Sequence, residues 1–260
     1  MADKVTFEEL PGKIARIWFN DPDSLNAMSL AMAEEFRTLV NKLASRPDSF
    51  HAVILSGKGK AFSAGGDLQM LEAKTLLSLE ENRSKMIEFY NSFLTIRNLK
   101  VPLIAAINGA AIGAGLCLAS ACDIRICVDS ARLGFTFVKL GLHPGMGGTF
   151  FLPQVVGVSR ARELLLTGRV IDAVEALRIG LVSETVSAEK IQERALQIAH
   201  EIAANGPQSV AQVLETLRYD NGALSDALER EAQCQALNYT SEQFKEGIRA
   251  VREKRAPQFQ

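Results

Sequence analysis

Hydrophobic positions along the first half of the chain form short continuous runs separated by polar or glycine-rich stretches. Four of these runs lie at 14–19, 51–57, 102–107 and 123–128. Runs of this length that are mostly apolar predict strands in a sheet covered on both faces. Between the first two runs, the spacing predicts a helix over 30–44 with Ser29 as its N-cap. Strands that alternate with helices in this way predict an α/β fold.

The pattern changes beyond residue 159, where helical spacing of the apolar positions predicts an almost wholly helical remainder. Pro207 and Gly222 are expected to interrupt these helices. We therefore predict a sheet-containing core over 1–195 and a helical segment over 196–260. The apolar face of that segment is suited to packing on the core or on another subunit.

Composition and charge exclude several classes of protein. The chain of 260 residues is 47% hydrophobic and 23% charged, which is typical of a folded globular protein. Its formal net charge is −1, so we expect no electrostatic field that would attract nucleic acid or acidic membranes. The uncharged stretch 101–122 could span a membrane, but Pro102, Asn108 and its glycines favour a strand, a turn and a buried helix. The N-terminus has no apolar leader, which predicts a cytoplasmic protein.

The four cysteines do not have the spacing of a metal site. Cys117, Cys122 and Cys127 are five residues apart, Cys234 is remote, and no histidine lies near the first three. We expect free, mostly buried thiols and no bound metal.

Two glycine-rich turns, AFSAGGD at 61–67 and NGAAIGAG at 108–115, stand out as candidate chemistry. Each is expected to leave a strand and enter a helix, which exposes unpaired backbone N–H groups at the helix start. Two such groups aimed at one point would form an anion or oxyanion site. The alternative is that both are tight turns with a packing role only.

A third segment, LGFTFVKLGLHPGMGGT at 133–149, completes a recognisable series. AFSAGGD, PLIAAINGAAIGAG, this segment and ARELLLTGR, in this order, resemble the crotonase superfamily of enoyl-CoA hydratases and isomerases. The resemblance covers residue 12 to the C-terminus. It implies a spiral of ββα units, an acyl-CoA-binding core and a C-terminal segment that forms homotrimers or hexamers. Coenzyme A would enter as part of the substrate, and no other cofactor is implied.

The resemblance also assigns roles to individual residues. The backbone amides of Gly66 and Ala114 would form the oxyanion hole for the thioester oxygen. The acyl-CoA would contact the segments around 25–27 and 63–68, the loop with His143 and the C-terminal region; the residues are Leu25, Ala27, Ser63, Ala64, Asp67, Leu68, His143 and Lys254. For His143 the alternative is a structural role, and for Lys254 it is a solvated charge on the tail.

The sequence departs from the resemblance at both positions where hydratases carry catalytic glutamates, which are Cys117 and Phe137 here. Isomerases of the family usually keep an acid at the position of Phe137, and some relatives place Asp in the turn that is Gly145-Met146 here. We therefore expect an enolate-stabilising enzyme whose ordinary hydratase activity is weak or absent.

Alternatives stay open at this point. One is other chemistry of the superfamily, such as thioester hydrolysis, decarboxylation or a double-bond shift. Another is a non-catalytic acyl-CoA-binding protein. A glutamate of the helical stretch 68–98 could supply an acid from an unusual direction; the candidates are Glu72, Glu80, Glu81 and Glu88.

Overall fold

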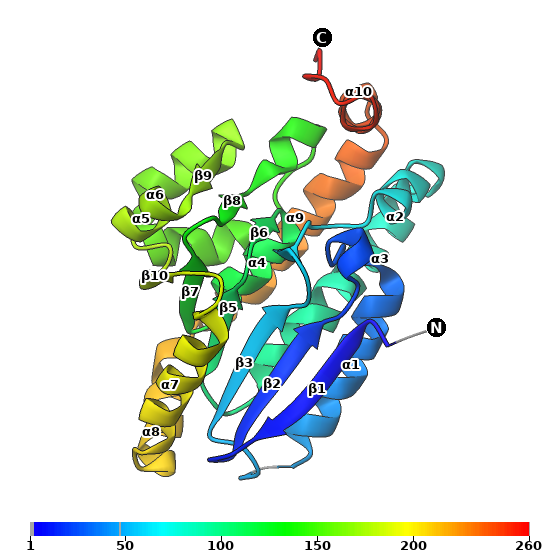
Figure 1. Cartoon of the computed structure of the whole chain (residues 1–260). Helices are drawn as coiled ribbons and strands as arrows, with labels where there is room; N and C mark the ends of the chain where they lie inside the picture. The colour runs from blue at the N-terminus through cyan, green and yellow to red at the C-terminus, as the bar shows by residue number, and fades with distance from the viewer. Residues whose placement is uncertain (1–2, 47, 260) are drawn as a thin grey trace.

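The computed structural model describes residues 3–46 and 48–259 and has a mixed α/β fold built on two sheets (Figure 1). The large sheet has the strand order β1-β2-β3-β5-β7-β10. Its strands are β1 (Val5–Leu10), β2 (Ile14–Phe19), β3 (Ala52–Gly57), β5 (Leu103–Ile107), β7 (Ile124–Val128) and β10 (Glu184–Val186). β1 is antiparallel to β2, and the other pairs are parallel. The predicted α/β class and the four predicted strands are confirmed.

A smaller sheet with the order β4-β6-β8-β9 follows the carboxyl ends of the large one. Its strands are β4 (Ala61–Ser63), β6 (Ala110–Ile112), β8 (Arg132–Gly134) and β9 (Val170–Asp172). A long strand is followed within a few residues by a short one in the pairs β3 and β4, β5 and β6, and β7 and β8. Because β4 pairs with β6 in parallel, the two glycine-rich turns that follow these strands are neighbours.

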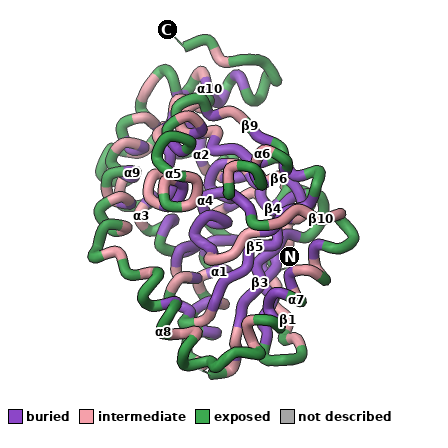
Figure 2. The backbone as a smooth tube through the Cα atoms, turned by 90° about the vertical axis from the view of Figure 1, so that its left-hand side faces the viewer, coloured by how far each residue is buried: buried purple, intermediate pink, exposed green. Residues whose placement is uncertain are grey.

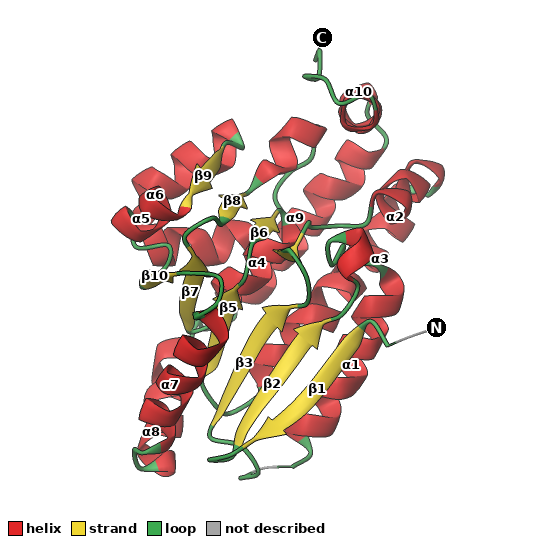
Figure 3. Cartoon of the chain, viewed as in Figure 1, coloured by secondary structure: helices red, strands yellow, loops and turns green. Residues whose placement is uncertain are grey.

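Ten α-helices occur in the described part of the chain (Figure 3). They are α1 (Leu30–Ala44), α2 (Leu68–Ala73), α3 (Leu79–Leu94), α4 (Ala114–Ala121), α5 (Gly148–Thr167), α6 (Ala173–Arg178), α7 (Ile191–Ala203), α8 (Pro207–Arg218), α9 (Ala223–Tyr239) and α10 (Glu242–Arg252). Short 3-10 helices are η1 (Pro22–Ser24), η2 (Lys74–Leu76), η3 (Thr95–Asn98) and η4 (Thr136–Leu140). The Ser29 hydroxyl accepts a hydrogen bond from the Met32 amide, so the predicted N-cap of α1 is confirmed.

The core lies between the large sheet and the helices on its two faces. β2, β3 and β5 are buried along their whole length, and Figure 2 shows the central strands and α4 as buried. On one face Phe19 packs against Phe36 and Phe93 of α1 and α3, with ring centroids 5.7 and 6.4 Å apart. α7 packs against β3 and β5. The stretch 101–122 contains β5, β6 and α4, and no described helix is both long and apolar enough to cross a bilayer.

The prediction of an almost wholly helical chain beyond residue 159 is wrong at β9 and β10. Each is a three-residue strand, too short to show an alternating pattern, and each forms because a neighbouring strand is available to pair with it. The predicted interruptions are confirmed, because Pro207 is the first residue of α8 and Gly222 is the N-cap of α9. α7 crosses residue 195, and α9 packs against α3 of the core.

Candidate active site

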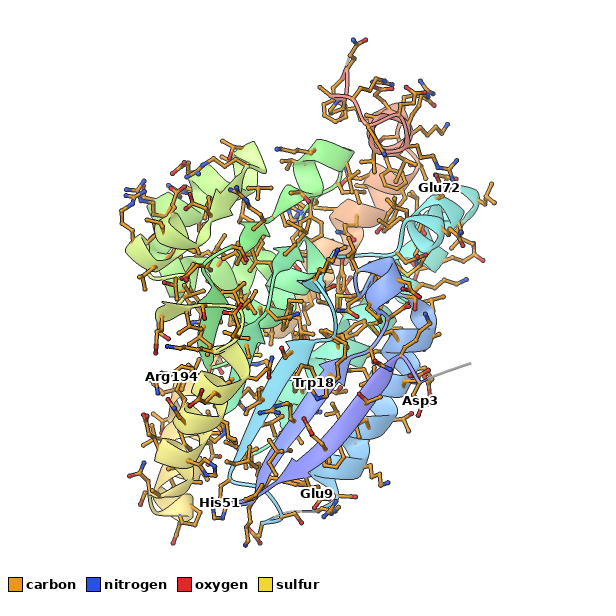
Figure 4. All side chains as sticks on the ribbon, in the orientation of Figure 1. Asp3, Glu9, Trp18, His51, Glu72 and Arg194 are labelled. Carbon is orange, nitrogen blue, oxygen red and sulfur yellow. The ribbon has the colours of Figure 1, made fainter. Side chains whose placement is uncertain are left out.

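A cavity of about 580 Å³ lies between the two glycine-rich turns, α2, α3 and α9. One end is formed by partly exposed residues such as Ala64 and Gly66, and the other by buried side chains such as Met86 and Tyr90. A larger cleft of about 690 Å³ lies at the opposite end of β3, beside His51 (Figure 4), and neither glycine-rich turn lines it. The first cavity is therefore the candidate site.

The first turn leaves β4 and enters α2, as expected. Asp67 caps α2, because its Oδ1 accepts a hydrogen bond of 2.8 Å from the Met70 amide. Two backbone hydrogen bonds hold the turn against Met28: the Met28 amide donates to Gly65 O at 2.7 Å, and the Asp67 amide donates to Met28 O at 3.2 Å. The Gly66 amide between them donates no hydrogen bond within the described part of the chain.

The second turn leaves β6 and enters α4. Gly113 is the N-cap of α4, and its amide donates a 2.8 Å bond to Gly134 O of β8. Ala114 is the first residue of the helix, where amides have no partner within the helix. Across residues 3–46 and 48–259 its N–H has no acceptor. The amino end of α4 also carries a partial positive charge.

The two turns approach each other closely at Gly65. This residue has φ +94°, and a Cβ atom added to it would lie 2.8 Å from Ile112 O and 3.8 Å from Ala114 N. Only glycine combines this backbone conformation with such a short separation. Gly66 and Ala114 consequently line the same cavity.

Neither position of the missing glutamates presents a charged group to the cavity. Phe137 lines the wall and is 9% exposed. Cys117 is fully buried on α4 behind the cavity wall, with Glu231 of α9 nearby. Burial raises the pKa of the Cys117 thiol well above its usual range, and the neighbouring Glu231 adds to the effect. Cys117 is therefore a thiol, not a thiolate, at neutral pH.

Four of the residues assigned to substrate contact line the cavity: Ala27, Ala64, Asp67 and Leu68. The other four lie outside its wall. Leu25 is exposed, and Ser63 is buried with its hydroxyl donating to Asn26 O. His143 lines a separate cleft, and Lys254 is exposed after α10.

The glutamates of the stretch 68–98 do not line the cavity. Glu72 forms an ion pair with Arg252 of α10, and Figure 4 shows it beside that helix. Glu81 completes a capping box with Ser78 at the start of α3. Glu80 and Glu88 pair with arginines of α3 and α1. Glu72 and Glu88 thus link helices, Glu80 and Glu81 stabilise α3 itself, and none of the four lines the cavity.

The sequence patterns did not indicate several polar residues of the cavity wall, and Tyr90, Gln235 and Tyr239 are the buried ones among them. They come from α3 and α9, which are distant in sequence and carry no motif. The missed Glu231 is buried, and its two oxygens accept bonds from Gly147 N and from Thr149 N and Oγ1 at 2.5–2.8 Å. This carboxylate caps the start of α5.

No group of three or more His, Cys, Asp and Glu side chains able to hold a metal occurs among the described residues. All four cysteines are free thiols.

The fold and the site define an α/β protein of ββα units with a cavity where two glycine-rich turns meet. The chain belongs to the enoyl-CoA hydratase/isomerase family, whose sequence model matches residues 9–260. A Thermus thermophilus protein named as an enoyl-CoA hydratase is 38% identical over 249 residues, which are 95% of this chain and 98% of that protein.

Solved structures agree with this family. An enoyl-CoA hydratase/isomerase from Pseudoalteromonas atlantica superposes with a TM-score of 0.85 at 30% identity, over 99% of this chain and 100% of that one. A monofunctional enoyl-CoA isomerase from Mycobacterium smegmatis gives a TM-score of 0.70 at 32% identity, over 90% of this chain and 99% of that one. The similar proteins therefore include names for both reactions.

Proposed function

We propose that the chain is an enzyme that binds an acyl-CoA thioester in this cavity and holds the thioester oxygen between the amides of Gly66 and Ala114. The observation that carries the proposal is that the two turns meet at one cavity, which both Gly66 and Ala114 line. Among the described residues, neither of their amides has a hydrogen-bond acceptor. Two donors directed at one oxygen stabilise the charge that develops as a thioester becomes an enolate. Each such donor typically contributes about 10²–10³ in rate.

We also infer that addition of water to a 2-enoyl-CoA is weak or absent. Hydration needs groups that activate a water and deliver a proton, work typically worth about 10²–10⁴ in rate. Cys117 is buried as a neutral thiol, and Phe137 has no proton to exchange. Asp67 is the one carboxylate among the described residues lining the cavity, and its Oδ1 already caps α2.

The coenzyme A portion is proposed to leave the cavity along Ala27, Ala64 and Leu68. These residues lie at the partly exposed end, so a long polar ligand could extend from there into solvent. Lys254 lies outside the cavity wall of its own chain, and a contact with the phosphates is proposed to come from a neighbouring copy.

Two measurements test the proposal. Calorimetry should detect binding of butyryl-CoA, and ultraviolet loss of the conjugated thioester should show slow or no turnover of crotonyl-CoA. The Gly65→Ala variant should weaken butyryl-CoA binding at least about tenfold, because the added Cβ would force Ile112 O and the second turn away. Gly206→Ala is the matched control, since its Cβ would meet nothing closer than 3.7 Å.

Each outcome has a distinct meaning. No affinity for any acyl-CoA would overturn the proposed function. Crotonyl-CoA turnover at rates usual for hydratases would overturn the interpretation of Cys117 and Phe137. Detection of products of hydrolysis, decarboxylation or a double-bond shift would support the proposed enolate site and identify a different reaction at it. Tight binding without turnover across a thioester panel would identify a non-catalytic binding protein.

A further inference from the structure

The buried end of the cavity contains three uncharged polar side chains among apolar ones. Tyr90 on α3 and Gln235 on α9 are each 2% exposed, and Tyr239 on α9 is fully buried. All three line the cavity. The surrounding wall is apolar and includes Leu71, Met86, Phe89, Leu142 and Met146. A ligand that reaches this end therefore lies beside these three residues.

The Gln235 amide has a fixed orientation. Its Nε2 donates a 2.7 Å hydrogen bond to His143 O. Rotating the amide by half a turn would place two carbonyl oxygens at that distance, with no proton between them. The Gln235 Oε1 must therefore face the two tyrosines, whose hydroxyl oxygens lie at 2.8 Å for Tyr90 and 3.0 Å for Tyr239.

Both tyrosine protons are consequently donated to protein atoms. A phenol has one proton, and the Tyr90 proton goes to Gln235 Oε1. The other neighbour of the Tyr239 hydroxyl is Met86 Sδ at 3.5 Å, which is also an acceptor. Burial raises the pKa of both tyrosines above the usual range, so both stay protonated. Toward a ligand, these oxygens can offer only lone pairs.

Gly145 leaves room for this arrangement. A Cβ atom at this position would overlap the Tyr90 hydroxyl and lie 2.7 Å from Gln235 Nε2. Any side chain at position 145 would therefore displace the Tyr90 hydroxyl from Gln235. The loop that holds His143 O therefore also determines that Tyr90 can reach Gln235.

We propose that Gln235 is a positioning residue that makes Tyr90 a hydrogen-bond acceptor, and that the cavity thereby selects acyl groups that carry a hydroxyl at their buried end. This inference rests on the proposed function, because the acyl chain must enter this cavity. A hydroxyl can donate to the Tyr90 oxygen. A carboxylate or ketone has only acceptors and would be buried against lone pairs without a hydrogen bond.

Calorimetry on the whole protein with matched thioesters tests the inference. The probes are butyryl-CoA against 4-hydroxybutyryl-CoA, hexanoyl-CoA against 6-hydroxyhexanoyl-CoA, and succinyl-CoA as the carboxylate. In at least one pair the hydroxylated ligand should bind up to about tenfold more tightly, as expected for one additional buried hydrogen bond. Succinyl-CoA should bind more weakly than butyryl-CoA.

Three variants isolate the residues. Tyr90→Phe should abolish the hydroxyl preference, since the ring remains and only the acceptor oxygen is lost. Gln235→Leu frees the tyrosine protons and should remove the discrimination against succinyl-CoA, a change that a purely structural role would not produce. Tyr219→Phe is the control, because Tyr219 is 77% exposed on the loop after α8.

Equal affinities within every pair for the wild-type protein, or a hydroxyl preference that persists in Tyr90→Phe, would overturn the inference and leave the proposed function intact. Failure of all these thioesters to bind the wild-type protein would instead overturn the proposed function.

Discussion

At the scale of single residues, the environment of a side chain decides its chemistry more than its type does. Cys117 lies near the start of a helix, a position that can lower the pKa of a thiol. Here it is fully buried, its Sγ would lie 3.0 Å from a Cβ at Gly148, and burial raises its pKa. Cys122 and Cys127 are also buried, and burial raises the pKa of each thiol to about 12.

These environments predict selective thiol chemistry. In the native protein, one of the four cysteines should react rapidly with Ellman's reagent, namely the half-buried Cys234. The other three should react only as the protein unfolds, because they are buried and their thiolates are disfavoured. Absorbance at 412 nm would measure about one rapid equivalent, and four after guanidinium is added.

Cys234→Ser is the control for this labelling and should remove the rapid equivalent. A rapid equivalent that persists in this variant would show that a core thiol, such as Cys117, is accessible and reactive after all.

At the scale of elements, α8 is attached to the core mainly through its last residue. Leu214 is its one buried residue among those described, whereas Arg218 makes hydrogen bonds to two loops of the core. The Arg218 guanidinium bonds both oxygens of Asp123 at 3.0 and 2.5 Å and the carbonyl of Leu99 at 2.8 Å. Asp123 Oδ2 in turn accepts a 2.7 Å bond from the Leu103 amide at the start of β5.

Arg218→Ala should therefore lower the free energy of unfolding by about 3 kcal/mol, because it leaves a largely buried carboxylate without its cation. Guanidinium unfolding followed by circular dichroism would measure the change. Arg194→Ala is the matched control, since its ion pairs with Glu184 and Glu201 are more exposed and should contribute less than about 1 kcal/mol. Equal losses in both variants would contradict this account of α8.

At the scale of the whole molecule, the helical segment 196–260 has apolar side chains that its own chain leaves exposed. They include Val213 at 58%, Leu217 at 76% and Leu237 at 60% exposure. Apolar residues in such numbers on one segment favour contact with another copy. We therefore propose that this segment mediates a homotrimer or hexamer.

Light scattering should accordingly give a mass of three or six times 28.3 kDa. The double variant Leu217→Glu/Leu237→Glu should shift the protein toward the monomer, because it would bury charges in the proposed interface. Leu76→Glu is the control, since this residue is 87% exposed on η2, outside the segment. A monomeric wild-type protein would exclude the assembly.

Much of the architecture could be predicted from local patterns, because burial on both faces forces continuous apolar runs such as 52–57 and 103–107. The Ser29 cap of α1 was equally predictable, since a cap is a contact between near neighbours in sequence. The edge strand β1 mixes polar and apolar residues that are mostly half-buried, and the three-residue strands β9 and β10 form only by pairing with distant partners. These elements could not be predicted from spacing.

The sequence by itself determined the α/β class, the two glycine-rich turns with Gly66 and Ala114, and the absence of carboxylates at 117 and 137. It could do so because turn chemistry and residue identity are local properties. Only the tertiary structure decided that both turns line one cavity, that Cys117 lies behind its wall, and that Tyr90 and Gln235 close its buried end. Those facts depend on contacts between elements that are distant in sequence, such as α3 and α9. The local sequence of either helix does not specify how the two pack together.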